Sequence, residues 1–376
     1  MVRQQVVIVL AGAVALWSTA ALAVTGTAEA GVARTAGAVT RAGAWRAAIE
    51  VPGAGRLNKG RDAGVFSVSC ASAGNCAAGG FYTDSSGHSQ TFVVSERDGA
   101  WRAAIEVPGT GALSKGRDAR VDSVSCAAAG NCAAGGSYTD RSGHRQAFVA
   151  SETNGAWREA IEVPGTGRLN RGGDAEVFSV SCASAGNCAA GGWYMDGSIA
   201  HQAFVASERD GAWRGAIEVP GTGPLNKDGG AAVFSISCTT AGNCAAGGFY
   251  TDGSFHSQAF VASEQDGAWR AAIKVPGTGA LNKGGAAVNS VSCTTAGNCA
   301  AGGFYADGSG NQQAFLASER DGAWRKAIEV PGTGALNKGG DAEIFSVSCA
   351  PAGNCAAGGD DKDRSGHHQA FVVSKN

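Results

Sequence analysis

The sequence lacks most of the features that would point directly to an activity. Its charge is almost balanced, with a formal net charge of -2, so nothing indicates nucleic acid or an anionic membrane as a partner. It has no P-loop, no HExxH motif and no nucleophile elbow, and the cysteine spacing does not fit the common zinc sites. We therefore expect no cofactor and no metal. Helical periodicity is missing as well, which favours an all-β fold.

Methionine and proline are scarce, with 2 and 8 residues among 376, whereas glycine is abundant at 59. This composition suits many short strands joined by tight turns. The one long apolar run, Val6–Trp17, precedes two sites for signal cleavage, after Ala23 and after Ala30. We predict a signal peptide over residues 1–30, a flexible lead-in over 31–44 and an extracellular location. The alternative is an uncleaved membrane anchor; no other stretch could span a membrane.

A repeat of about 56 residues occupies the predicted domain, residues 45–376. The tryptophans that mark it are separated by 56, 56, 56, 56 and 55 residues; they are Trp45, Trp101, Trp157, Trp213, Trp269 and Trp324. A period of this length is typical of a propeller blade or a similar supersecondary unit.

Four short strands are predicted in each repeat. In the first repeat they are Val65–Cys70, Cys76–Tyr82, Gln90–Ser95 and Trp101–Val107. Alternation in the first strand places Phe66, Val68 and Cys70 on one face. The first two strands carry small residues and the fourth carries bulky ones, so we expect the order to run from a crowded axis to the rim.

The two ends of the chain suggest how the repeats are joined. A fourth strand, Ala44–Val51, comes before any first strand, and the chain leaves after a third strand, Gln369–Ser374. Unpaired edge strands promote aggregation, and a closed ring removes them. We therefore predict a six-bladed β-propeller of four-stranded antiparallel blades, with the N-terminal strand closing the last blade. The alternative is an open row of β-modules.

Twelve cysteines form six pairs with five residues between the two members of each pair. Opposed residues on a hairpin lie within disulfide range, whereas packed sheets are about 10 Å apart. Disulfides within each repeat are therefore predicted, and an even cysteine count after a signal peptide agrees with them. The pairs are Cys70 and Cys76, Cys126 and Cys132, Cys182 and Cys188, Cys238 and Cys244, Cys293 and Cys299, and Cys349 and Cys355.

The segment from Ser95 to Trp101, Ser-Glu-Arg-Asp-Gly-Ala-Trp, recurs between the third and fourth predicted strands. It resembles the Asp-box of the propeller repeats of bacterial neuraminidases, although its Asp directly precedes Gly and the usual Thr is missing. The resemblance implies a propeller in which Asp and Ser satisfy turn amides, away from the active face. It does not imply sialidase activity.

The loops between the second and third strands and the loops between blades are expected on the same face of the ring. That face carries a circle of polar residues with neighbouring tyrosines, and loops on a rigid scaffold often carry function. The alternative is that the aspartates only shape the turns and the histidines are solvated. The candidate ligand-binding residues are Tyr82, Asp84, His88, Tyr138, Asp140, His144, Tyr194, Asp196, Tyr250, Asp252, His256, Tyr305 and Asp307.

The repeated stretch Asn75–Gly80, Asn-Cys-Ala-Ala-Gly-Gly, and its five copies resemble those of secreted repeat proteins of actinobacteria. That resemblance implies export and a repeat fold only. Our first hypothesis is a secreted, non-catalytic binding or scaffold propeller, lectin-like, that acts as a monomer on an extracellular glycan or surface polymer. The alternative is a glycan-cleaving enzyme. A repeat lectin predicts several equivalent sites, and an enzyme predicts one.

Overall fold

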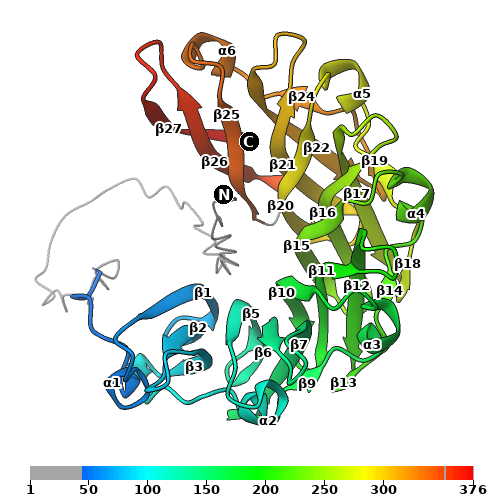
Figure 1. Ribbon diagram of the computed structural model, residues 1–376. Coiled ribbons are helices and arrows are strands. Elements are labelled where there is room, and N and C mark those ends of the chain that lie inside the picture. Colours follow the sequence, from blue (N-terminus) through cyan, green and yellow to red (C-terminus); the bar gives the residue numbers. More distant parts are fainter. Residues whose placement is uncertain (1–44, 351–352, 376) are drawn as a thin grey trace, which may run out of the picture.

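The computed structural model describes residues 45–350 and 353–375, so the predicted signal peptide and lead-in lie outside the described residues. Six antiparallel sheets follow one another around a common axis in the order of the sequence (Figure 1). In each sheet the first strand lies nearest the axis, as expected from its small residues. The fold is therefore all-β, with the radial arrangement of a β-propeller. None of the helices in the described part is long and apolar enough for a membrane span.

The first three sheets show the pattern of the repeat. Each has three long strands, and the third pairs with one short outer strand in the first sheet and with two in the second and third sheets. Their strands are β1 (Ala63–Ser72), β2 (Asn75–Thr83), β3 (Ser89–Arg97) and β4 (Ala100–Trp101); β5 (Ala119–Ala128), β6 (Asn131–Thr139), β7 (Arg145–Thr153), β8 (Ala156–Trp157) and β9 (Ile161–Glu162); and β10 (Ala175–Ser184), β11 (Asn187–Met195), β12 (His201–Arg209), β13 (Ala212–Trp213) and β14 (Ile217–Glu218).

The fourth and fifth sheets repeat this pattern, and the sixth has three strands. The strands are β15 (Ala231–Thr240), β16 (Asn243–Thr251), β17 (Ser257–Gln265), β18 (Ala268–Trp269) and β19 (Ile273–Lys274); β20 (Ala286–Thr295), β21 (Asn298–Ala306), β22 (Gln312–Arg320), β23 (Ala323–Trp324) and β24 (Ile328–Glu329); and β25 (Ala342–Cys349), β26 (Cys355–Lys362) and β27 (His368–Lys375).

The fourth strand of each blade is broken, contrary to the continuous strand that we predicted. In the first sheet Trp101 ends β4, and pairing resumes only at Ile105, which bridges to Val93. Between them the amide of Ala104 donates to the carbonyl of Pro52, 2.7 Å away, in the preceding linker. The break in the fourth strand therefore allows its backbone to bind the linker that precedes the sheet.

Each linker contains one short helical turn that the sequence did not predict. The turn begins after a glycine in the left-handed region, such as Gly109 at φ 85°, and in α2 the Thr110 hydroxyl donates to the Val107 carbonyl at 2.8 Å. The turns are α1 (Ala54–Leu57), α2 (Thr110–Ser114), α3 (Thr166–Leu169), α4 (Thr222–Leu225), α5 (Thr278–Leu281) and α6 (Thr333–Leu336).

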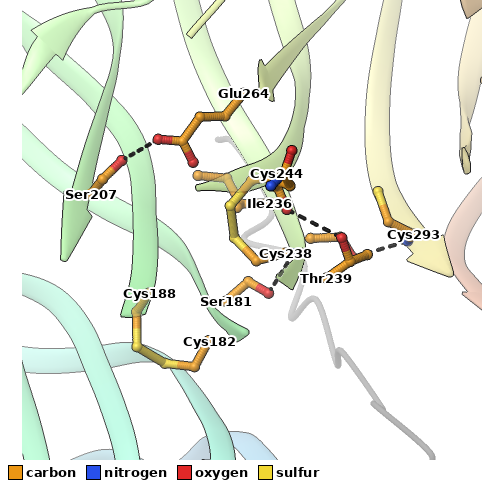
Figure 2. Close-up of a disulfide and its surroundings, with 12 residues drawn as sticks. Ser181, Cys182, Cys188, Ser207, Ile236, Cys238, Thr239, Cys244, Glu264 and Cys293 are labelled. Carbon is orange, nitrogen blue, oxygen red and sulfur yellow. Dashed lines mark hydrogen bonds between the residues drawn. A yellow bond between two sulfur atoms is a disulfide. The ribbon is translucent and has the colours of Figure 1, made fainter. Parts of the chain in front are cut away.

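Disulfides lock the hairpin between the first and second strands of every sheet, as predicted. Cys70 and Cys76 are direct partners in the register, and the six Cα–Cα distances lie between 3.9 and 4.1 Å. Figure 2 shows Cys182–Cys188 and Cys238–Cys244 on neighbouring sheets. All the cysteines in the described residues are paired in this way.

Serine hydroxyls join successive sheets near the axis. The amides of Val124 and Cys126 donate to the hydroxyls of Ser67 and Ser69 at 3.0 and 2.9 Å, and the same pair of bonds recurs at each later junction. In Figure 2 the Ser181 hydroxyl binds Cys238 in this way. The Ser-Val-Ser-Cys motif therefore supplies acceptors to the next sheet.

The serine of the Asp-box-like segment also acts between sheets. The Ser95 hydroxyl donates to Glu152 at 2.9 Å and accepts from Trp157 Nε1 at 3.2 Å. It does not cap the turn, as the resemblance had implied. Instead the turn amide of Asp98 lies 3.5 Å from the side-chain oxygen of Asn75 on the cysteine hairpin.

The predicted closure of the ring is absent from the structure. Residues 45–51 form no strand, and Trp45 is fully exposed, while Ala44 lies outside the described residues. The first and sixth sheets stand apart in Figure 1, and no strand pairs with the outer edge of β27 in the described residues.

Glycines in the second strand set the distance between sheets. A Cβ at Gly191 would lie 2.6 Å from Ile236 Cδ1 and 2.7 Å from Val233 Cγ1, both fully buried in the next sheet. Such distances are shorter than any real carbon contact, so only glycine allows the sheets to pack this closely.

We predict that Gly191→Ala lowers the free energy of unfolding by about 1–3 kcal/mol, because overpacking forces neighbouring side chains out of their rotamers. Urea unfolding would measure the change. Gly215→Ala is the matched control, since a Cβ there would meet nothing within 4 Å and should cost nothing. Equal stability of the two variants would contradict the packing argument.

Candidate functional site

The predicted loop face exists as expected. The linkers lie beside the turns between the second and third strands, since the Gly60 amide donates to the Thr83 carbonyl at 2.7 Å. On the opposite side the Gly99 amide donates to the Gly74 carbonyl at 2.9 Å, which joins the Asp-box-like turn to the cysteine hairpin. We call the side with the linkers the turn face.

The predicted aspartates of the turn face are all engaged in their own turns. Asp84 Oδ1 accepts the amides of Ser86 and His88 at 2.7 and 3.1 Å, and Oδ2 accepts from Gln90 Nε2 at 3.1 Å. Partial burial opposes ionisation, but these hydrogen bonds outweigh it and hold the pKa of Asp84 below its usual value. The other predicted aspartates make equivalent bonds; they are Asp140, Asp196, Asp252 and Asp307.

The predicted tyrosines lie inside the blades. They are between 3 and 6% exposed, and the Tyr82 hydroxyl donates to Glu106 at 3.3 Å. Burial first, and then the charge of Glu329, raises the pKa of Tyr305 to about 12. Tyr138 and Tyr194 bind their glutamates as Tyr82 does, whereas in the fourth sheet Lys274 occupies the position of this glutamate. That any of these residues binds a ligand stays a prediction.

The predicted histidines lie at the surface of the same turns. The His88 side chain is 45% exposed with Nδ1 3.6 Å from Asp118, and the His144 side chain is 56% exposed. His256 is exposed, and its amide donates to Asp252. The structure therefore brings each Tyr, Asp and His set into one blade but separates the tyrosine from the solvent-facing residues.

Two large apolar side chains stand on the turn face where the other repeats have glycine. Ile199 is 76% exposed and Phe255 is 81% exposed, at the tips of the turns that follow β11 and β16. Both have left-handed backbones, with φ of 63° and 61°. The matching residues in the other sheets are all glycine with similar φ; they are Gly87, Gly143, Gly310 and Gly366.

This backbone conformation is unfavourable for both residues. The left-handed region costs a non-glycine residue about 1–2 kcal/mol, and isoleucine is worse placed because it is β-branched. Exposure of the side chains brings no compensating burial. Strain kept at a surface position is a signal of function, because the fold itself accepts glycine there four times.

An arc of aromatic rings extends across the third and fourth sheets. Each ring lies next to the following one in space. The ring centroids are 3.7 Å apart for His201 and Trp193, 6.2 Å for Trp193 and Phe178, 5.8 Å for Phe178 and Phe234, and 5.3 Å for Phe234 and Phe249. We call these five residues the aromatic arc. Ile199 lies two residues before His201, and the amide of Phe255 donates to Asp228 of the linker between the two sheets.

The arc depends on a β-bulge in each innermost strand. The register shifts between Val177 and Ser179, which leaves Phe178 as an extra residue, and Phe234 has the same place in β15. Simple alternation had put the equivalent Phe66 on one face with Val68, and the bulge corrects this. Bulges re-aim side chains and are common beside functional sites.

A charged cluster borders the arc between the second and third sheets. Arg120 pairs with both Asp122 and Glu176, and Arg145 binds Asp174 at 2.6 Å and Glu176 at 2.9 Å. The guanidinium of Arg145 also lies over the ring of Trp193, 5.4 Å from its centroid. We call these five charged residues the charged cluster.

Asp122 and Glu176 are two carboxyl groups that share one arginine. Burial, followed by the charge of Glu176, raises the pKa of Asp122 well above its usual range, although Arg120 opposes this. The fifth sheet has the same arrangement with an amide, where Asn289 Nδ2 donates to Glu343 Oε2 at 3.0 Å. A protonated Asp122 can donate to Glu176 in the same way.

We predict that Asp122→Asn increases stability relative to the wild-type protein as pH rises. With a raised pKa, native Asp122 keeps a proton that the unfolded chain releases, so its contribution is complete below about pH 4 and is lost as pH passes the native pKa. The asparagine cannot lose this proton. Urea unfolding from pH 4 to pH 8 measures the difference; a gap that stays constant with pH would refute the raised pKa.

The arc and the charged cluster were not predicted from the sequence. A signal was available in the residues where the near-identical copies differ, since Ile199 and Phe255 replace glycine and Asp122 replaces phenylalanine. The described residues hold no cluster of His, Cys, Asp and Glu suited to a metal ion.

Comparisons with known proteins give no family. No family model matches the chain, and no curated protein matches it significantly. Among solved structures it is similar to a protein of unknown function from Dyadobacter fermentans, with 12% identity, a TM-score of 0.43 and coverage of 85% of this chain and 96% of that chain. It is also similar to the Aleuria aurantia lectin (9%, 0.39, 81% and 92%) and to a sialidase of Trypanosoma rangeli (11%, 0.37, 82% and 54%). Values this low do not bear on function.

Proposed function

We propose that this protein is a secreted, non-catalytic binding protein that holds an extracellular glycan at one site on the turn face of the third and fourth sheets. The observation that supports this most is the pair Ile199 and Phe255, which keep large exposed side chains in a backbone conformation suited to glycine. Such a conformation persists when the exposed side chain is needed by something outside the fold.

A carbohydrate suits the chemistry of this surface. Sugar rings have apolar C–H faces that stack on aromatic side chains and hydroxyl groups that need polar partners. All five residues of the aromatic arc are half-buried, so the arc offers ring surface in a fixed position. Arg145 and Asp174 of the charged cluster lie at its edge with side chains 35% and 22% exposed.

One site replaces the several equivalent sites of the initial hypothesis. The two large apolar side chains that replace exposed turn glycines lie on the third and fourth sheets, whereas the predicted Tyr and Asp positions recur with partners inside their own repeats. A sixfold site would need the same exposed groups in every blade. The differences therefore favour a single, asymmetric site.

An extracellular location agrees with the six disulfides, since such bridges persist in oxidising compartments. The signal peptide over residues 1–30 and the monomeric state remain part of the proposal. Neither is needed for the binding site itself, because all residues of the site belong to one chain.

We predict that Phe255→Gly weakens glycan binding roughly tenfold while it increases stability by about 1 kcal/mol. The lost ring surface accounts for the first effect and the relieved backbone for the second. A glycan array would identify the ligand, and calorimetry with that glycan would give a stoichiometry of one. Thermal unfolding would measure the gain in stability.

Gly143→Phe is the matched control, since it places the same side chain on the same turn of the second sheet. It should cost stability and leave binding unchanged. Absence of any glycan ligand, or unaltered affinity in Phe255→Gly, would overturn the proposal. Release of a cleaved sugar during the titration would support the enzyme alternative instead.

A further inference from the structure

Tryptophans of the outer strands fasten each sheet to the one before it. Trp157 of the second sheet reaches back to Ser95 of the first, where Nε1 donates to the hydroxyl at 3.2 Å. The same bond joins Trp213 to Ser151, Trp269 to Ser207 and Trp324 to Ser263, at 3.1–3.3 Å. Trp157 packs against a buried hydrophobic cluster that includes Ala77, Val93, Cys132, Ala134 and Ala150.

The junction between the fifth and sixth sheets has this site without its tryptophan. A cavity of about 560 Å³ opens there. Its walls include the residues that correspond, one repeat period after another, to those around Trp157; they are Ala300, Leu316, Ser318, Cys355, Ala357 and Val373. We call this cavity the tryptophan socket.

One segment of the described chain has the sequence of an outer strand but belongs to no sheet. Residues 45–51 read Trp-Arg-Ala-Ala-Ile-Glu-Val, which is identical to Trp101–Val107. Trp45 is fully exposed and Ile49 is 66% exposed. On the other side, Val372 of β27 is 85% exposed, while its counterpart Val93 in the first sheet is fully buried and bridges to Ile105.

The linker that follows this segment is already in place. The Ala104 amide donates to the Pro52 carbonyl at 2.7 Å, as the Ala160 amide does to the Pro108 carbonyl at the next junction. At each junction such a linker arrives from the outer strand of the preceding sheet. In a ring, the sheet that precedes the first is the sixth.

We propose that the tryptophan socket receives Trp45 of the same chain, so that residues 45–51 complete the sixth sheet and close the ring. In this arrangement Trp45 Nε1 donates to Ser318, and Ile49 pairs with Val372 as Ile105 pairs with Val93. The register of the proposed pairing is taken from the other repeats. The corresponding segment occurs five more times in the chain, and four of its tryptophans donate to a serine of the preceding sheet.

The inner strands agree with this closure independently. Val65 is 42% exposed, whereas the matching Val121, Val177, Val233 and Val288 are fully buried against a glycine of the preceding sheet. The glycine that corresponds on the sixth sheet is Gly358, and a Cβ there would meet no atom closer than 3.8 Å. Closure places Val65 against Gly358.

An engineered disulfide tests the register. Val93 and Ile105 exchange both backbone hydrogen bonds at 3.0 Å, and such pairs have Cα atoms about 5.5 Å apart, within disulfide range. We expect the double variant Ile49→Cys, Val372→Cys to form the new bridge within one chain, as seen by peptide mapping without reduction. Glu50→Cys with Val372→Cys is the control, one residue out of register, and should remain reduced.

The outcomes of this experiment distinguish the occupant of the tryptophan socket and the register of the pairing. A bridge between two chains would show that the socket takes the segment of a second copy, which overturns closure within the chain. Equal bridging in the control, or no bridging in either variant, would overturn the proposed register. None of these results depends on glycan binding, so the failure of one proposal leaves the other intact.

A glycine substitution tests closure without new cysteines. Gly358→Ala should lower the melting temperature by about 2–10 °C, because the added methyl group would meet Val65 in the closed ring. It should act like Gly191→Ala. If Gly358→Ala leaves the melting temperature unchanged while Gly191→Ala lowers it, the ring is open in solution.

Discussion

The close approach of successive sheets is the constraint on which the structure depends. Gly191 and its counterparts leave room for a valine or isoleucine of the next sheet, and the hydroxyls of Ser179 and Ser181 accept amides from it. Both contacts lie near the axis, where the blades converge. The disulfide Cys182–Cys188 holds the same hairpin, so the covalent and non-covalent restraints act on one element. Most of the repetition in the sequence follows from this one requirement.

Repetition also makes the exceptions informative. A position that only supports packing has the same neighbours in every blade and is free to keep the same residue. Ile199 and Phe255 have neighbours much like those of Gly87, yet they carry large side chains at an energetic cost to the turn. Packing within the fold therefore does not account for these two residues, and the arc from His201 to Phe249 extends the difference between repeats over two sheets.

Much of the fold was predictable from the sequence, and most of the candidate site was not. The period of the tryptophans and the C-x5-C pairs predict the sheets and the disulfides, because both depend on local geometry. The bulge at Phe178 and the break after Trp101 were missed, since each arises from bonds to other parts of the chain, such as that from Ala104 to Pro52. Asp84 resembled a ligand-binding residue because a turn aspartate and an exposed one look alike in sequence.

The sixth sheet lacks the partners of two hydrogen bonds that recur in other sheets. Tyr82 donates to Glu106 in the first sheet, but Asp361 has the place of that tyrosine in the sixth, where Glu50 would meet a second carboxylate. Lys375 likewise replaces the glutamate that Ser95 binds in Glu152. In the proposed closure, residues 45–51 would therefore bind the sixth sheet without the first bond, and the second would be missing between the fifth and sixth sheets. Closure as we propose it would therefore draw most of its free energy from the hydrophobic contacts of Trp45 and Val65.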